Sequence, residues 1–242
     1  MIYNRLAHFT RISISLVCCC LLSYAAMAQK LPFFDEVQAF KKQDSIHPPV
    51  QHGIVFIGSS SFARWNNLEE SFPDHTIINR AFGGSSLPDL IRYVDDITLP
   101  YQPRQIVIYC GENDFAGNDS ITAKIVTTHF KKLFKLIRER LPKLPIAFVS
   151  IKPSPSREKY WSKMIAANAS IKSFLKKKKY TQFIDVYSKM FHPDGTVMKD
   201  IFVEDNLHMN AKGYAIWQKV IEPYLLAAKQ GTKKIRDQIN LT

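Results

Sequence analysis

Five short apolar runs alternate with helical patterns along this chain, and this order constrains the fold more than any other feature. The runs are brief and partly β-branched, as is typical of strands buried on both faces of a sheet. Strands that alternate with helices predict one α/β domain, in which right-handed crossovers wrap a parallel sheet on both faces. The predicted strands are Ile54–Ile57, Thr76–Asn79, Gln105–Cys110, Ile146–Ile151 and Gln182–Val186.

The clearest helical pattern is an apolar stripe between Ile121 and Leu141, which repeats about every 3.6 residues with Lys and Arg opposite. Asp119 or Ser120 is expected to cap its start, and Pro142 follows its end. Further helices are predicted over Leu87–Ile97, Lys159–Lys178 and Ala211–Ala228, with a partly helical stretch over Phe34–Lys42.

The first 28 residues have the pattern of a secretory signal peptide. A basic start precedes an apolar core from Ile12 to Tyr24, which is short for a membrane span, and Ala26-Met27-Ala28 is a small-x-small cleavage signal. We therefore expect a secreted or periplasmic protein that begins at about Gln29. An uncleaved N-terminal anchor is the alternative.

The remaining chain is predicted to hold a lead-in at 29–50, one α/β domain at 51–228 and a basic C-terminal tail at 229–242. Three of the four cysteines lie in the signal segment, so an internal disulfide is excluded after cleavage. The remaining cysteine, Cys110, ends an apolar run, and we expect it to be a buried small hydrophobic residue.

The charge balance is strongly basic. The net charge is +12, and loss of residues 1–28, which carry Arg5 and Arg11, leaves +10. No nucleic-acid-binding module accompanies this charge, so we expect a solvated basic surface and no nucleic-acid partner, with weak association with anionic envelope surfaces as the alternative. Basic residues are concentrated in Lys131–Arg140, Lys172–Lys179 and Lys229–Arg236.

Three strands run directly into turns that could carry chemistry: Gly58-Ser59-Ser60-Ser61, Gly83-Gly84 and Gly111-Glu112-Asn113-Asp114. Parallel sheets bind ligands at the carboxyl ends of their strands. A serine near a helix N-terminus, glycine amides and the Asn113 side chain together suit a nucleophile with oxyanion donors. The three consecutive serines leave the nucleophile open. Taken singly, each block could be a plain turn, a helix cap or a structural Asn.

The fourth block, Asp205-Asn206-Leu207-His208, precedes the last helix. A spacing of three residues brings Asp205 and His208 to one side of a helical turn. His208 could then accept a serine proton while Asp205 holds the imidazole in the required tautomer. The other histidines of the expected mature chain have structural interpretations, because they lie in the lead-in, in polar loops or in the amphipathic helix. Glu112 and Asp114 by themselves are weak grounds for a cation site.

With these blocks in this order, the chain resembles the SGNH (GDSL-like) hydrolase superfamily over residues 53–225. The resemblance assigns Ser60 as nucleophile, and it implies an oxyanion hole from the Ser60 and Gly84 amides and the Asn113 side chain. Asp205 and His208 match the family's Asp-x-x-His. Ser59 stands where the family usually has Asp, which bears on the geometry of the turn rather than on the four residues of the family name.

The resemblance implies a flavodoxin-like three-layer α/β/α sandwich with a five-stranded parallel sheet. It also implies ester hydrolysis through an acyl-enzyme, without a metal or organic cofactor. The first hypothesis is a secreted esterase that removes short acyl groups, acetyl among them, from carbohydrate or a similar small-molecule ester. A lysophospholipase or lipase-type acylhydrolase is one alternative, and a non-catalytic glycan-binding domain with the same fold is another.

Overall fold

The computed structural model describes residues 30–227. The predicted signal peptide at 1–28, the expected mature start at Gln29 and the basic tail at 229–242 lie outside these residues. From Asp35 onward the described chain forms one compact unit. No helix within residues 30–227 is both long enough and apolar enough to cross a membrane.

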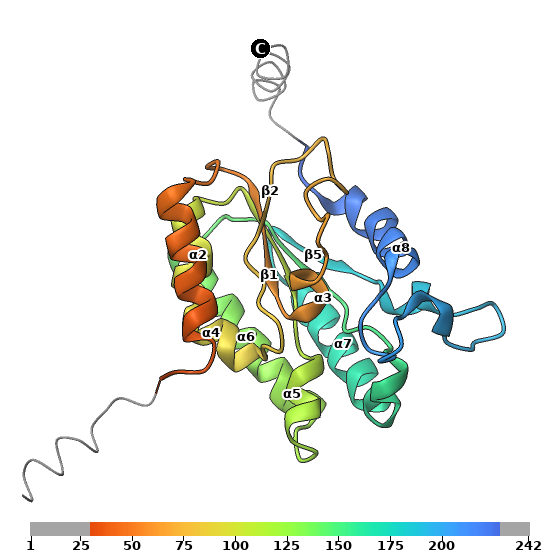
Figure 1. Ribbon diagram of the computed structural model, residues 1–242. Coiled ribbons are helices and arrows are strands. Elements are labelled where there is room, and N and C mark those ends of the chain that lie inside the picture. Colours follow the sequence, from red (N-terminus) through yellow and green to blue (C-terminus); the bar gives the residue numbers. More distant parts are fainter. Residues whose placement is uncertain (1–29, 228–242) are drawn as a thin grey trace, which may run out of the picture. The chain divides into compact units, whose positions relative to one another are not determined.

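The sheet has five parallel strands in the order β2-β1-β3-β4-β5. This arrangement confirms the predicted fold class, because every strand is parallel and the chain crosses between them through helices (Figure 1). Strands β1 and β3 are fully buried along their length, as continuous apolar runs predict. The strands are β1 (Ile54–Gly58), β2 (Ile77–Asn79), β3 (Gln105–Tyr109), β4 (Ile146–Val149) and β5 (Thr181–Ile184).

Helices cover both faces of the sheet. Helices α4, α6 and α7 contact one another in a row over one face, and α3 and α8 pack on the other (Figure 1). The α-helices are α2 (Phe34–Ile46), α3 (Ser60–Ala63), α4 (Leu87–Thr98), α5 (Glu112–Gly117), α6 (Ala123–Arg140), α7 (Trp161–Lys176) and α8 (Ala211–Ile221). Short 3-10 turns are η1 (Leu99–Tyr101), η2 (Pro155–Tyr160), η3 (Tyr187–Met190), η4 (Lys199–Ile201) and η5 (Glu222–Tyr224).

Aromatic side chains fill the space between α3, α8 and the sheet. The Trp217 ring lies 4.8 Å from the Tyr109 ring and 5.9 Å from the Phe62 ring, centroid to centroid. On the other face, the Phe130 ring of α6 packs edge-on at 4.7 Å from the Phe148 ring of β4. Each face of the sheet therefore has its own apolar layer, and large aromatic rings supply much of the buried area.

The start of α6 differs from the prediction. Its N-cap is Thr122, whose hydroxyl accepts a hydrogen bond from the Ile125 amide at 3.3 Å, rather than Asp119 or Ser120. The Asp119 carboxylate is occupied elsewhere, because it accepts hydrogen bonds from Lys159 and Tyr160. Tertiary partners thus displaced a local capping preference.

The last helix also ends earlier than the predicted Ala228. Helix α8 stops at Ile221, and η5 follows with Pro223 at its centre. Proline cannot donate to the helical ladder, so it favours an end at this point. Beyond it, the Gln105 side chain at the start of β3 bonds the Tyr224 carbonyl and the Leu226 amide, at 2.8 and 2.9 Å. The segment at 224–226 is thereby tied to the amino-terminal edge of the sheet.

The predicted lead-in contains α2, which extends beyond the expected Lys42 to Ile46. Its Asp44 carboxylate accepts hydrogen bonds from Arg80 at 2.5 Å and from the Tyr101 hydroxyl at 2.6 Å. Both partners belong to the sheet domain and are buried. The lead-in is therefore attached to the domain by a largely buried ion pair rather than standing apart from it.

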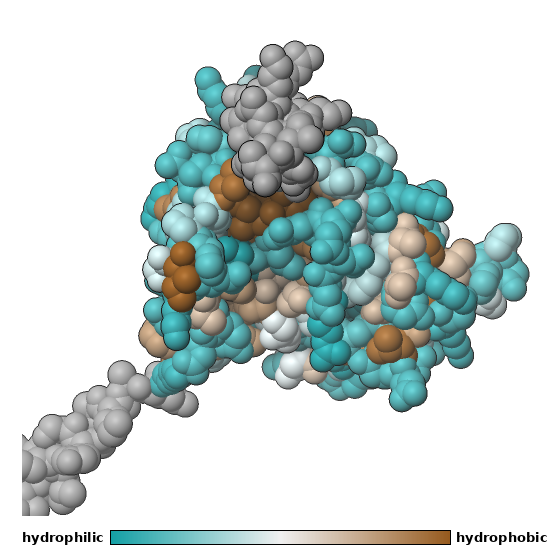
Figure 2. All heavy atoms as spheres, turned by 45° about the horizontal axis from the view of Figure 1, so that its top comes forward, coloured by the Kyte–Doolittle hydropathy of each residue, from teal (hydrophilic) through white to brown (hydrophobic). Residues whose placement is uncertain are grey.

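The amino-terminal edge of the sheet comes forward in Figure 2, and most of the residues visible there are hydrophilic. Hydrophobic residues appear mainly as separate spots, apart from one larger area in the upper part of the view. Isolated exposed hydrophobic residues are normal for a folded domain. The chemistry predicted from the sequence lies at the opposite edge, where α3 and α5 begin.

Candidate active site

Two glycines let the first and third strands end side by side. Gly58 has φ +148°, and a Cβ on it would lie 1.9 Å from the Tyr109 carbonyl oxygen. Gly111 has φ +122°, and a Cβ there would lie 2.8 Å from Ile151 Cδ1. Any side chain at either position would clash and strain the backbone. These glycines therefore bring the serine block and the Asn113 block to adjacent positions at the carboxyl edge.

Of the three consecutive serines, Ser60 is the one in contact with a histidine. Its Oγ lies 3.0 Å from His208 Nε2. Ser59 precedes α3 as its N-cap, and both Ser59 and Ser61 are buried. This contact joins residues 148 positions apart and involves the same serine that the family resemblance assigns as nucleophile.

Asp205 lies on the other side of the imidazole. Its Oδ2 lies 2.5 Å from His208 Nδ1, and its Oδ1 accepts hydrogen bonds from the Leu207 and His208 amides, each at 2.8 Å. Partial burial acts to raise the pKa of Asp205, but these hydrogen bonds outweigh it and lower that pKa to about 2. The carboxylate is therefore ionised at neutral pH and can fix the imidazole orientation.

Ser85 connects the three loops at the carboxyl edge, which the sequence did not indicate. Its hydroxyl donates to the Gly58 carbonyl at 3.0 Å, and its carbonyl accepts from the Asn113 side-chain amide at 2.9 Å. Gly84, just before it, has φ +81°, which suits glycine. The loops that carry Ser60, Gly84 and Asn113 are therefore held together by one fully buried residue. A second N–H of the Asn113 amide remains for another acceptor.

A buried ion pair, also missed by sequence reasoning, lies under the site. Lys152 donates to Glu112 at 2.5 Å and to the Ser154 hydroxyl at 2.7 Å, and Tyr109 donates to Glu112 at 2.8 Å. Burial lowers the pKa of Lys152, and the adjacent Glu112 carboxylate opposes that shift. A lysine in an otherwise apolar stretch after β4 was the available signal, since buried lysines require a partner.

The two acidic residues of the Asn113 block have separate partners. Glu112 faces Lys152, whereas Asp114 accepts from the Leu87 amide at 3.0 Å and lies 3.3 Å from His129 Nδ1. Burial raises the pKa of Asp114. Within residues 30–227 no group of three or more His, Cys, Asp or Glu side chains is arranged to hold a metal ion. His129 is a second histidine with a carboxylate neighbour, beyond the one predicted.

Cys110 is fully buried, as expected for a small hydrophobic residue at the end of β3. Its thiol lies 3.6 Å from the Ser85 carbonyl, and burial raises its pKa well above the usual value. A thiol with a raised pKa is a poor nucleophile at neutral pH. Cys110 is therefore poorly suited to act as a nucleophile.

A parallel α/β sheet with a serine, a histidine and a carboxylate in contact at its carboxyl edge is an arrangement found in α/β hydrolases. The model of the GDSL-like lipase/acylhydrolase family matches residues 53–216, so the chain belongs to that family and is an ester hydrolase. Among curated proteins, the chain is similar to platelet-activating factor acetylhydrolase IB subunit alpha2 of Gallus gallus. The two are 27% identical over 180 residues, which cover 70% of this chain and 73% of the relative.

Solved structures share the fold. A GDSL-like lipase from Bacteroides thetaiotaomicron superposes with a TM-score of 0.67 at 19% identity, covering 78% of this chain and 96% of that one. A carbohydrate esterase family 3 protein from Talaromyces cellulolyticus superposes with a TM-score of 0.57 at 14% identity, covering 72% and 96%. At these identities the similarity concerns the fold alone.

Proposed function

We propose that this protein is an exported serine esterase that removes short acyl groups, acetyl first among them, from carbohydrate. The observation that carries the proposal is the position of His208, between Ser60 Oγ at 3.0 Å and Asp205 Oδ2 at 2.5 Å. A histidine that contacts both a hydroxyl and an ionised carboxylate is suited to move a proton to and from the hydroxyl.

The proposed reaction has two halves. His208 accepts the Ser60 proton as Ser60 attacks the ester carbonyl, and the oxyanion is held by the Ser60 and Gly84 amides and the Asn113 side chain. The alcohol leaves with a proton from His208, and the acyl group stays on Ser60. Water then attacks the acyl-enzyme with His208 again acting as base, which releases the acid and restores the serine.

Carbohydrate as the substrate is supported by the export signal at 1–28 and by the shared fold with a carbohydrate esterase. A lysophospholipid or related lipid ester is the second candidate. It is favoured by the net charge of +10 that remains without residues 1–28 and by the 27% identity to a protein named platelet-activating factor acetylhydrolase. Export into the periplasm and weak association with anionic envelope surfaces belong to the same proposal.

The test is turnover of p-nitrophenyl acetate by the mature chain and its serine variants. Ser60→Ala should abolish turnover, whereas Ser59→Ala and Ser61→Ala, which alter neighbouring buried serines, should retain it. Wild-type turnover by Ser60→Ala would overturn the assignment of the nucleophile. A fluorophosphonate probe should label the wild type at Ser60, and an unlabelled protein would instead support a non-catalytic glycan-binding domain.

A substrate panel separates the two candidate functions. Acetylated sugars and short-to-long acyl esters, lysophospholipids included, are compared by kcat/KM with the wild-type mature chain. We expect the highest kcat/KM for acetylated sugars and a decreasing kcat/KM as the acyl chain lengthens. Preference for lysophospholipids would establish the second candidate instead.

A further inference from the structure

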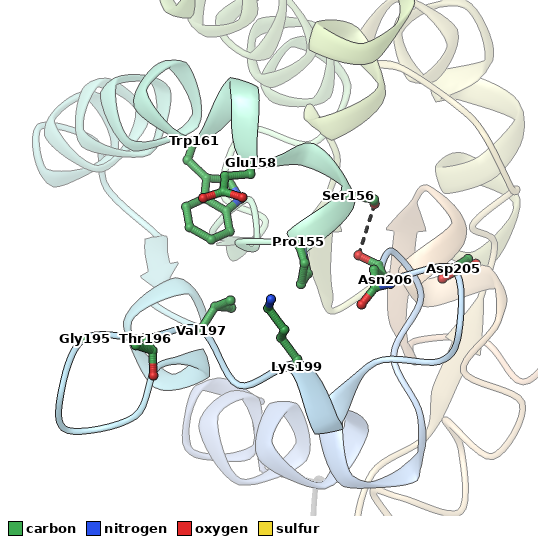
Figure 3. A pocket seen from close by; sticks show the side chains of 10 residues that line it. All are labelled: Pro155, Ser156, Glu158, Trp161, Gly195, Thr196, Val197, Lys199, Asp205 and Asn206. Carbon is green, nitrogen blue, oxygen red and sulfur yellow. Dashed lines mark hydrogen bonds between the residues drawn. The ribbon is translucent and has the colours of Figure 1, made fainter.

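A cavity of about 560 Å³ opens beside the Asp205–His208 loop, and the reaction proposed above does not use it. It lies between η2 with the first residue of α7 on one side and the segment 195–206 on the other (Figure 3). Asp205 and Asn206 are among its lining residues. Because Asp205 also contacts His208 at 2.5 Å, the cavity borders the residue that orients the proposed catalytic histidine.

One wall is an aromatic ring held in a fixed orientation. The Trp161 indole N–H donates to the Ser154 carbonyl at 3.0 Å, and the ring packs edge-on against Phe191 with centroids 6.1 Å apart. Figure 3 shows the Trp161 side chain pointing into the cavity with Glu158 next to it. A ring fixed at its N–H and at one edge presents a preorganised flat surface to a ligand.

The facing wall is a short hairpin rather than a loose loop. Phe191 and Val197 form an antiparallel bridge, the His192 amide donates to the Thr196 carbonyl at 2.8 Å, and the Met198 amide donates to Met190 at 3.0 Å. These bonds fix the backbone that leads to Lys199. Both cavity walls are therefore built by hydrogen bonds that hold them without a ligand.

Two charged side chains in the cavity lack partners. Glu158 and Lys199 line it from opposite walls, and within residues 30–227 neither side chain makes an ion pair or a hydrogen bond. In Figure 3 the Lys199 side chain points into the cavity from the η4 side. Glu158 offers acceptors and Lys199 offers donors. The cavity thus combines a flat apolar surface with free hydrogen-bonding groups of both kinds.

This combination selects among ligand classes. An acyl chain would remove both charges from water without replacing their hydrogen bonds, which is unfavourable. Quaternary ammonium groups are bound by cages of aromatic rings, and Trp161 is the one aromatic residue among the described lining residues. A pyranose ring has an apolar face of C–H groups and an edge of hydroxyl groups, each a donor and an acceptor, and it fits both features.

We propose that this cavity binds a pyranose unit of a glycan, with Trp161 as the stacking surface and Glu158 and Lys199 bonding its hydroxyl groups. The bound unit neighbours the acylated sugar presented to Ser60, so the inference rests on the proposed function. Binding there would favour glycan esters over simple esters that do not reach the cavity.

Binding is tested on the full mature chain with deacetylated cello-, xylo- and chito-oligosaccharides, measured by isothermal titration calorimetry. Trp161→Ala should weaken the affinity by about tenfold or more. Trp161→Phe should recover part of it, and Lys189→Ala, which removes an exposed lysine outside the cavity, should leave it unchanged. Absence of oligosaccharide binding by the wild type, or equal binding by Trp161→Ala, would overturn the proposal. Binding of phosphocholine by a wild type that binds no oligosaccharide would also overturn it, in favour of a lipid head group.

Kinetics separate this inference from the proposed function. Trp161→Ala and Lys199→Ala should raise KM for acetylated oligosaccharides by about tenfold, while p-nitrophenyl acetate turnover stays at the wild-type rate. If the wild type binds oligosaccharides but releases no acetate from acetylated ones, the proposed function fails and the cavity assignment stands. If it deacetylates them and Trp161→Ala leaves KM unchanged, the cavity assignment fails and the function stands.

Discussion

At the scale of single residues, Asp205 shows how local geometry sets chemistry. Its side chain is 42% exposed, yet its pKa falls to about 2, because three hydrogen bonds from residues 207 and 208 favour the charged form. Without these hydrogen bonds, a carboxylate as exposed as this one would keep a pKa near its ordinary value. The positive φ of Asn206, +53°, turns the backbone so that both amides face the same oxygen.

We expect Asp205→Asn to lower kcat by about 10³–10⁴-fold, because the amide no longer favours the imidazole tautomer that accepts a proton from serine. The fold should persist, since the side chain keeps its shape. Steady-state kinetics with p-nitrophenyl acetate measure the loss, and circular dichroism checks the fold. A decrease of less than tenfold would show that Asp205 does not orient His208.

The same carboxylate should contribute a pH-dependent stability. Its pKa is about 2 in the folded chain against an ordinary 3.8, so its stabilising effect is complete above about pH 4 and is lost as pH falls towards 2. Urea unfolding of the wild type and Asp205→Asn at several pH values measures this effect. The stability difference between the two should shrink below pH 4, and a difference independent of pH would contradict the low pKa.

Asn113→Ala tests the proposed oxyanion donor. We expect kcat to fall by about 10²-fold with KM little changed, since an oxyanion donor acts mainly in the transition state. Asn118→Ala, at the end of the same short helix, is the matched control and should keep full activity. An effect confined to KM would make Asn113 a binding residue only.

At the scale of secondary-structure elements, the buried Lys152–Glu112 pair joins the loop after β4 to the start of α5. The two side chains are 1% and 4% exposed and lie 40 residues apart in the chain. A charge this buried is tolerated only with its partner and further hydrogen bonds, which Ser154 and Tyr109 provide. Glu112 directly precedes Asn113, the proposed oxyanion donor, so the ion pair also fixes the start of helix α5, which carries Asn113.

Removing one member of this pair should destabilise the chain strongly. We expect Lys152→Met to lower the free energy of unfolding by about 3–5 kcal/mol, because Glu112 is left buried and uncompensated. Lys143→Met, which changes an exposed lysine, is the control and should have little effect. Urea denaturation measures both. The double variant Lys152→Met with Glu112→Gln should lose less free energy of unfolding than the sum of the losses in the two single variants. A loss equal to that sum would contradict direct coupling between the two side chains.

At the scale of the whole molecule, one aromatic cluster links the last helix to the helix that carries Ser60. Trp217 of α8 is fully buried and contacts Phe62 of α3 and Tyr109 of β3. The elements that position Ser60 are therefore stabilised by a segment about 150 residues later in the chain. The loop that carries His208 leads directly into the same helix α8.

We expect Trp217→Ala to cost about 3–5 kcal/mol of stability through the cavity it leaves. Trp217→Phe should cost less, because it keeps part of the ring contact. Thermal unfolding measures the shift in Tm. Turnover per folded molecule, measured well below Tm, should stay close to wild type, since no reacting atom is removed. An unchanged Tm would show that the cluster is not a main source of stability.

The order of strands and helices could be predicted because it follows from the local periodicity of apolar residues in the sequence. The five parallel strands and their crossovers follow from apolar runs separated by amphipathic segments. Element ends were less predictable: the α6 cap moved to Thr122 because Asp119 bonds Lys159 and Tyr160. The buried Lys152–Glu112 pair and the Ser85 bonds were missed, because each joins residues distant in sequence.

The sequence by itself determined the sheet, the turns at its carboxyl edge and the local Asp205–His208 pair, since each depends on residues near one another in the chain. The family resemblance singled out Ser60 among the three serines, but only the tertiary structure shows its hydroxyl in contact with His208. The tertiary structure also decided that Glu158, Trp161 and Lys199 face one cavity. Such contacts depend on how crossovers and hairpins place distant segments, and no local pattern encodes that placement.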